Sequence, residues 1–167
     1  MDSEKIFIAG FSAGGHLAAS YGVFWDREEL WKEMGLEEAD LKPAGLILSY
    51  PVITSGEYAH HDSFHNLLGE RYEELKEMMS LEKQVSKNTP PTFLWHTFTD
   101  DLVPVENTIL FFQALRKCGV PTEMHIYPCG GHGLALANEE TSNTLGGGIQ
   151  KECQSWISLV KTWMEWI

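Results

Sequence analysis

The sequence predicts an α/β protein in three layers, with a mostly parallel sheet of about four strands between helices. Four short runs rich in β-branched or aromatic residues, at positions 5–10, 44–50, 92–96 and 123–127, alternate mostly with helix-length stretches. These runs are apolar almost throughout, which is typical of parallel strands that helices cover on both faces. We therefore expect a sheet whose central strands are buried on both sides.

The helices are predicted from apolar periodicity. The stretch 106–118 has apolar residues at helical spacing, and Gly119 follows it as a C-cap. The stretch 150–167 is amphipathic, and its face bearing Trp156 and Trp163 is expected to dock on the sheet. Further helices are predicted over 14–23, 26–34 and 70–79.

One polar segment, 55–91, interrupts the alternation of strands and helices. Long connections of this kind lie at the rim of a fold, so we interpret it as a rim or lid excursion. The sequence contains no internal repeat, low-complexity tract or linker, and residues 1–167 are expected to form a single domain.

Composition restricts the class of partner. The chain has 12 Lys and Arg against 24 Asp and Glu, a formal charge of −12. Nucleic acid and anionic membranes attract basic surfaces, so neither is expected as a partner. Three unpaired cysteines argue against a disulfide framework or a zinc knuckle. With no apparent export signal or membrane span, we expect a cytoplasmic protein without metal or organic cofactor.

The first strand leads directly into Gly10-Phe11-Ser12-Ala13-Gly14, and a helix is predicted to follow. A serine on a sharp strand-to-helix turn is lifted clear of the sheet, and small neighbours avoid clashes there. The N–H of the next residue, Ala13, and the helix N-terminus then face a reacting carbonyl. This pattern predicts that Ser12 is a nucleophile with Ala13 N–H as an oxyanion donor.

A serine nucleophile needs a base and an acid that orients the base. The third strand runs out into Asp100 and Asp101, and the fourth runs out towards His132. The order serine, aspartate, histidine at the ends of the first, third and fourth strands is that of an α/β-hydrolase triad. The chemistry alone does not choose between the two aspartates.

The remaining candidates are more simply explained by structural roles. His16, His96 and His125 are expected to pack or form hydrogen bonds. His61 and His65 have the i, i+4 spacing of a metal pair, but a polar rim loop is the favoured interpretation. Four aromatic residues could line a pocket or pack in the core, and one glutamate is a weak candidate for anchoring a peptide terminus: Trp25, Trp31, Tyr58, Phe64 and Glu57.

At these motifs the chain resembles the α/β-hydrolase superfamily, and within it bacterial esterases and lipases of the acetyl esterase and acetylxylan esterase type. The resemblance is carried by "KIFIAGFSAGGHLAAS", "AGLILSYPVI", "PPTFLWHTFTDDLVPVENT" and "VPTEMHIYPCGGHGLALA". In such enzymes the acid lies in an H-x-x-x-D-x-x-V-P pattern, which implies Asp100 rather than Asp101. Ser12 and His132 match the nucleophile and the base.

The resemblance covers only the C-terminal half of the usual fold. In these enzymes further strands precede the elbow, and a loop among them supplies the second oxyanion donor, whereas here the elbow begins at residue 10. The first strand is consequently expected to have an open edge. Because an open apolar edge can pair with another chain, we expect self-association there.

The leading hypothesis is a serine hydrolase of the carboxylesterase or acetylesterase type, acting on small acylated substrates that include acetylated sugars. Ser12, His132 and Asp100 would be nucleophile, base and orienting acid. Two alternatives remain open: a catalytically weak or inactive half-domain acting as a binding or assembly module, and a peptidase of the prolyl-oligopeptidase type.

Overall fold

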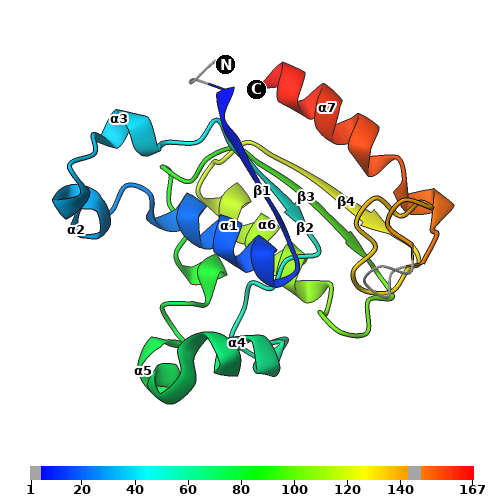
Figure 1. Ribbon diagram of the computed structural model, residues 1–167, viewed down its shortest axis with the longest axis horizontal. Coiled ribbons are helices and arrows are strands. Elements are labelled where there is room, and N and C mark those ends of the chain that lie inside the picture. Colours follow the sequence, from blue (N-terminus) through cyan, green and yellow to red (C-terminus); the bar gives the residue numbers. More distant parts are fainter. Residues whose placement is uncertain (1–4, 143–147) are drawn as a thin grey trace.

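A computed structural model describes residues 5–142 and 148–167 (Figure 1). Its sheet contains β1 (Phe7–Phe11), β2 (Gly45–Ser49), β3 (Thr92–Thr97) and β4 (Thr122–Tyr127). The strands are all parallel and lie in the order β1-β2-β3-β4. Each lies within two residues of the run that predicted it, so the predicted parallel sheet is confirmed.

The burial of each strand follows its place in the sheet. Every residue of β2 and β3 is buried, as expected for central strands covered on both faces. The two edge strands, β1 and β4, are only partly buried. Within the described residues β1 pairs with β2 alone, and Ile6, just before β1, and Phe11, its last residue, are 50% and 39% exposed.

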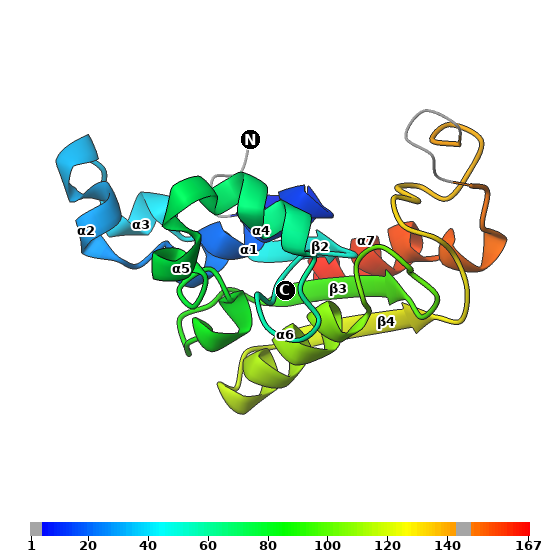
Figure 2. The same cartoon turned by 90° about the horizontal axis from the view of Figure 1, so that it is seen from below.

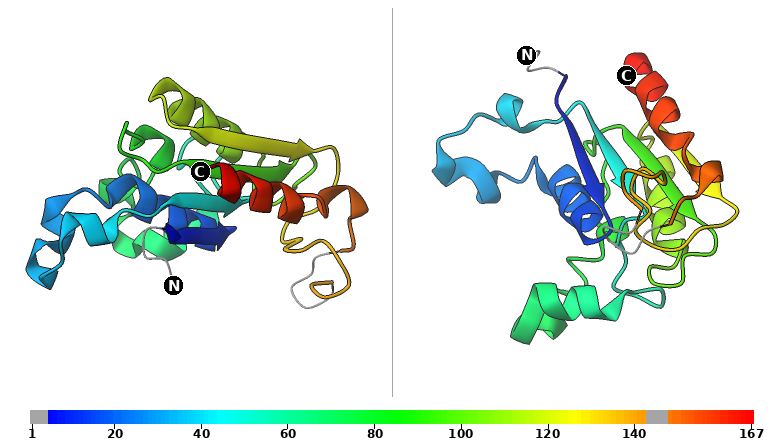
Figure 3. Two further views of the ribbon diagram at one scale, coloured as in Figure 1. Left: turned by 90° about the horizontal axis from the view of Figure 1, so that it is seen from above. Right: turned by 45° about the vertical axis from the view of Figure 1, so that its right-hand side comes forward.

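Helices cover the sheet on both faces, in three layers. Helices α1 (Ala13–Phe24) and α6 (Glu106–Lys117) pack on the face that carries Leu46, Leu48 and Leu94. Helix α7 (Trp156–Trp166) packs on the opposite face, where Trp163 meets Phe93 in an aromatic contact. Figure 3 shows α7 across the sheet from α1 and α6. Because successive side chains of a strand point to opposite faces of the sheet, the core consists of two clusters, one on each face.

Most of the predicted helices are found with shifted ends. Helix α1 is one residue longer at each end than the predicted 14–23, whereas α6 and α7 are shorter than predicted. The stretch 26–34 becomes α2 (Glu28–Trp31) followed by η2 (Lys32–Met34). The last helix begins at Trp156, after a 3-10 turn η5 (Lys151–Cys153). A one-turn helix, α3 (Glu38–Leu41), was not predicted, because four residues give too short a period to detect.

The segment 55–91 lies beside the sheet in short helical pieces, at the lower left of Figure 1 and in front in Figure 2. They are α4 (His61–Leu68), η3 (Gly69–Arg71), α5 (Tyr72–Leu75) and η4 (Leu81–Lys83).

The single helix predicted over 70–79 is wrong, because tertiary hydrogen bonds compete with a continuous helix in this segment. Ser55 donates its hydroxyl to the Lys76 carbonyl at 2.8 Å. The Leu81 N–H donates to the Ile53 carbonyl at 3.1 Å and draws the chain back to the residues after β2.

Within residues 5–142 and 148–167, every helix is too short or too polar to cross a membrane.

Candidate active site

The turn between β1 and α1 holds Ser12 in a strained conformation. Its φ is 55° and its ψ is −123°, a combination that non-glycine residues rarely adopt. The surrounding backbone holds it there: the Ser12 N–H donates to the Ser49 carbonyl at 3.0 Å, and the Val52 N–H donates to the Ser12 carbonyl at 3.1 Å. The end of β2 therefore holds the elbow from both sides of Ser12.

Two glycines around the elbow have no room for a side chain. A Cβ on Gly10 would overlap the carbonyl oxygen of Gly14 and lie 2.8 Å from Ala18 Cβ, and one on Gly15 would lie 2.7 Å from Pro51 Cβ. A Cβ on Gly14 would meet no atom within 4 Å. The expectation that both glycines flanking the serine avoid clashes is thus correct for Gly10 and wrong for Gly14, because α1 points that Cα away from the described residues.

The three residues predicted to act together lie in hydrogen-bond contact. The Ser12 Oγ is 2.7 Å from His132 Nε2, and His132 Nδ1 is 2.7 Å from Asp100 Oδ2. His132 comes from the loop after β4, and Asp100 comes from the loop after β3. Because a carboxylate oxygen only accepts, His132 Nδ1 carries the proton and Nε2 is free to accept the Ser12 hydroxyl. Ser12 thus donates to His132 and His132 donates to Asp100, which is the arrangement required of a base that acts on a serine.

The structure places Asp100, and not Asp101, against the histidine. The Asp100 side chain is fully buried, whereas Asp101 is exposed. Asp100 Oδ1 accepts the N–H groups of Leu102 and Val103 at 3.0 and 2.9 Å.

Asp100 is held in its ionised form. Burial alone would raise the pKa of its carboxyl, but the hydrogen bonds from His132, His96 and the Val103 N–H outweigh burial and hold that pKa well below its usual value. The carboxylate is therefore charged at any pH where the histidine can act as a base.

Tyr50 is a residue of the site that sequence reasoning missed. It follows β2 with a φ of 38°, and its ring meets the His132 ring edge-on at 5.0 Å. Its hydroxyl accepts the Ala135 N–H at 2.9 Å, which supports the loop that carries His132. Burial, and to a lesser extent the charge of Asp100, raises the pKa of Tyr50 to about 12, so the phenol stays protonated. A positive φ at a tyrosine is a tertiary feature that no local sequence signal predicts.

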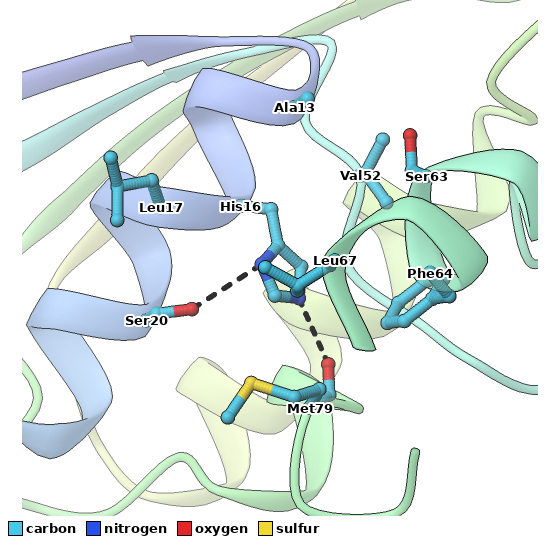
Figure 4. A pocket seen from close by; sticks show the side chains of 9 residues that line it. All are labelled: Ala13, His16, Leu17, Ser20, Val52, Ser63, Phe64, Leu67 and Met79. Atoms are coloured by element: carbon cyan, nitrogen blue, oxygen red, sulfur yellow. Dashed lines mark hydrogen bonds between the residues drawn. The ribbon is translucent and has the colours of Figure 1, made fainter. Parts of the chain in front are cut away.

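A largely apolar cavity of about 270 Å³ opens beside Ala13, between α1 and α4 (Figure 4). Its walls include His16 and Leu17 from α1 and Phe64 and Leu67 from α4. His16 donates from Nε2 to the Met79 carbonyl at 3.0 Å, and burial lowers its pKa. His16 is thus an uncharged wall of the cavity, in keeping with the structural role predicted for it.

The other candidates lie apart from Ser12 or have structural partners. His61 and His65 are both on α4, but no cluster of three metal-ligating side chains occurs among the described residues, and His65 stacks on Tyr72. His125 bonds Glu123 at 2.8 Å on the edge strand.

Of the aromatic residues considered for a pocket, Phe64 lines the cavity beside Ala13. Trp25 and Trp31 line a second cavity, of about 400 Å³, along α1. Tyr58 and Glu57 are exposed.

Comparison with known proteins identifies the family. Residues 1–145 match the prolyl oligopeptidase family. The chain belongs to this family. It is 46% identical over 151 residues to endo-1,4-beta-xylanase B of Butyrivibrio fibrisolvens and 35% identical over 142 residues to an acetylxylan esterase of Xylanibacter ruminicola. These matches cover 89% and 81% of this chain but only 23% and 27% of the two relatives.

Solved structures of similar proteins have the same fold over nearly all of this chain. An acetyl ester-xyloside bifunctional hydrolase from Caldicellulosiruptor lactoaceticus is 42% identical with a TM-score of 0.74, over 94% of this chain and 54% of that one. A carboxylesterase from Lactobacillus plantarum is 30% identical with a TM-score of 0.83, over 99% of this chain and 59% of that one. This chain therefore has part of an α/β-hydrolase fold and spans little more than half of these structures.

Proposed function

We propose that this chain carries the nucleophile, base and acid of a serine esterase that cleaves small acyl esters. The observation that supports this most is the continuous hydrogen-bonded path from Asp100 through His132 to Ser12, with Ser12 raised on a strained elbow. This arrangement meets the requirements of an activated serine: a base within 2.7 Å of the hydroxyl and a buried carboxylate that orients the base.

The proposed reaction has two steps. His132 Nε2 takes the proton of Ser12 as the Ser12 Oγ bonds to the ester carbonyl carbon, and the carbonyl oxygen becomes an oxyanion. The Ala13 N–H, at the unsatisfied N-terminus of α1, stabilises this charge. The tetrahedral intermediate expels the alcohol, which receives the proton from His132. His132 then deprotonates a water molecule, whose oxygen bonds to the acyl carbon on Ser12. The acyl–Oγ bond breaks, the Ser12 Oγ takes the proton back from His132, and the acid is released.

The cavity beside Ala13 favours an uncharged acyl group. Its lining contains no Asp, Glu, Lys or Arg among the described residues. Several relatives are named for acetyl esters of xylan or for carboxylic esters, so we propose a small acylated substrate, with acetylated sugars as the first class to test.

The same cavity argues against the peptidase alternative. A peptidase that recognises a peptide terminus needs a charged anchor. Glu57, the candidate considered for that role, is exposed and does not line the cavity.

The decisive test is hydrolysis of p-nitrophenyl acetate by the chain and by Ser12→Ala. Ser158→Ala, an exposed serine on α7, is the matched control. We expect the rate to fall to the uncatalysed level in Ser12→Ala and to stay unchanged in Ser158→Ala. A serine-directed fluorophosphonate should label the wild type at Ser12.

Two outcomes would favour the alternatives. Equal rates in wild type and Ser12→Ala would contradict the esterase and favour a binding or assembly module. Faster cleavage of a matched aminoacyl amide than of the ester would favour a peptidase.

A further inference from the structure

His96, on β3, is a fully buried histidine that the proposed reaction does not use. Both of its ring nitrogens have partners. Nδ1 is 2.8 Å from the hydroxyl of Thr108 on α6. Nε2 is 2.9 Å from the carbonyl oxygen of Val103 and 3.2 Å from Asp100 Oδ2. The ring thus lies between α6 and the carboxylate that orients the proposed base.

The partners of His96 determine where its proton lies. A backbone carbonyl oxygen can only accept a hydrogen bond, so the Nε2 atom facing Val103 must carry the hydrogen. In the neutral ring Nδ1 is then an acceptor, and the Thr108 hydroxyl can donate to it. The protein therefore presents a fixed N–H donor to Asp100 Oδ2.

Asp100 Oδ2 is the same oxygen that accepts the His132 Nδ1–H. Two histidine donors converge on this atom, and the backbone N–H groups of Leu102 and Val103 hold the other oxygen. These two histidine and two backbone N–H groups together fix the orientation of the carboxylate, so that a lone pair of Oδ2 is directed at His132.

We propose that His96 is a positioning residue: its Nε2–H orients the Asp100 carboxylate towards His132 and shares the charge on Oδ2. This inference rests on the proposed esterase reaction. The titratable side chains that face the carboxylate are His96, His132 and Tyr50. Without the His96 donor, Oδ2 would form its hydrogen bond with His132 alone. Its negative charge would then stabilise the protonated imidazolium form of His132 more strongly, up to a higher pH.

The test compares His96→Leu, which removes the donor, with His96→Gln, whose amide N–H can replace Nε2–H. Active sites are titrated with a fluorophosphonate, so that misfolded protein does not count. We expect kcat to fall by roughly 10- to 100-fold in His96→Leu, since a small misorientation of catalytic groups costs this much. KM should stay within about two-fold, and His96→Gln should keep about a third or more of kcat, because an orienting interaction acts on the transition state.

The pH profile distinguishes positioning from simple stability. In His96→Leu the acid limb of kcat/KM should move to higher pH. His125→Leu is the matched control and should keep both rate and profile, because His125 lies on the edge strand β4, where its ring bonds Glu123 and packs on Phe93. Wild-type kcat per titrated site in His96→Leu would overturn the proposal. So would equal losses in the Leu and Gln variants with an unchanged profile.

Nitrogen-15 NMR of the histidine rings at pH 8 tests the same contact without activity. A hydrogen on His96 Nε2 supports the proposal, and a ring with its only hydrogen on Nδ1 overturns it.

If the wild type proves no more active than Ser12→Ala, the proposed function fails. The downfield His132 Nδ1–H signal then tests the orientation directly: it should persist in His96→Gln and move in His96→Leu, and an identical signal in both variants would overturn the proposal. Should His96→Leu not fold, the ring tautomer in the wild type decides.

Discussion

Gly10 and Gly14 are four residues apart around the elbow, and the carbonyl oxygen of Gly14 occupies the place where a Cβ on Gly10 would stand. The contact arises because α1 begins one residue after Ser12 and folds back against the end of β1. The two glycines of the motif therefore have different roles: Gly10 allows the turn to close, whereas Gly14 has open space on its Cα.

This difference predicts opposite effects of the same substitution. Gly10→Ala should destabilise the protein by about 1–3 kcal/mol or more, since the new methyl group would overlap backbone atoms that cannot move aside. Gly14→Ala should be neutral or stabilise by up to about 1 kcal/mol, because alanine favours the helix more than glycine does. Urea unfolding of both variants would measure the free energies. Equal destabilisation would contradict the described geometry.

The two adjacent aspartates offer a second matched pair. Asp100→Asn should lower kcat by roughly 10³- to 10⁴-fold, because a neutral amide neither fixes the His132 tautomer nor stabilises its cation. Asp101→Asn should leave kcat within about two-fold, since surface changes away from the site have small effects. Ester hydrolysis per titrated active site makes the comparison. A similar loss in both variants would exclude the assignment of Asp100 as the orienting acid.

The low pKa of Asp100 predicts how stability changes with pH. The carboxyl has a lower pKa in the folded chain than in the unfolded chain, where it is about 3.9, so the unfolded state binds the proton more readily. Its contribution to stability is present above that value and is lost as the pH falls towards the folded pKa. Urea midpoints from pH 7 to pH 3 should fall more steeply for wild type than for Asp100→Asn. Parallel curves for the two proteins would show that the carboxyl is not stabilised in its charged form.

The free edge of β1 leads to a prediction about assembly. We propose that two copies associate through this edge, because the alternating N–H and C=O groups of one edge strand complement those of a second in an antiparallel pair. Ile6 and Phe11, at the two ends of this strand, are partly exposed, and Leu17 on α1 is 73% exposed.

Light scattering after size-exclusion chromatography should therefore give the mass of a dimer at micromolar concentration. Ile6→Lys with Ala9→Lys should shift it towards the 18.9 kDa monomer, since charge on an edge strand opposes pairing. A well-folded wild-type monomer would contradict this association.

The parallel sheet, the helices over both faces and the elbow were predictable from sequence because each depends on a local pattern. Apolar runs of strand length, helical periodicity in α6 and α7, and a serine between glycines are all visible within windows of a few residues. The pairing of Ser12 with His132 was predictable in a different way, since carboxyl ends of parallel strands meet at one edge of the sheet.

Contacts between distant segments account for what the sequence did not show. The helix expected over 70–79 breaks because Ser55 and Ile53 supply hydrogen-bond partners from outside it. Tyr50 and His96 looked like ordinary strand residues. Tyr50 lies 85 residues before Ala135, whose N–H its hydroxyl accepts, and His96 lies only four residues before Asp100 but meets its carboxylate because the loop after β3 turns back on the strand.

The sequence by itself thus determined the order of strands and helices, and it indicated Ser12 at the first turn as the candidate nucleophile. The structure placed against His132 the aspartate that the family resemblance implied. Only the tertiary structure decided which glycine of the elbow has no room for a side chain, and it alone brought a second histidine to the carboxylate. The physical reason is the distance along the chain over which each effect acts. Backbone propensity and periodicity act over a few residues, whereas the orientation of a buried side chain is set by whichever atoms the fold brings within hydrogen-bond distance of it.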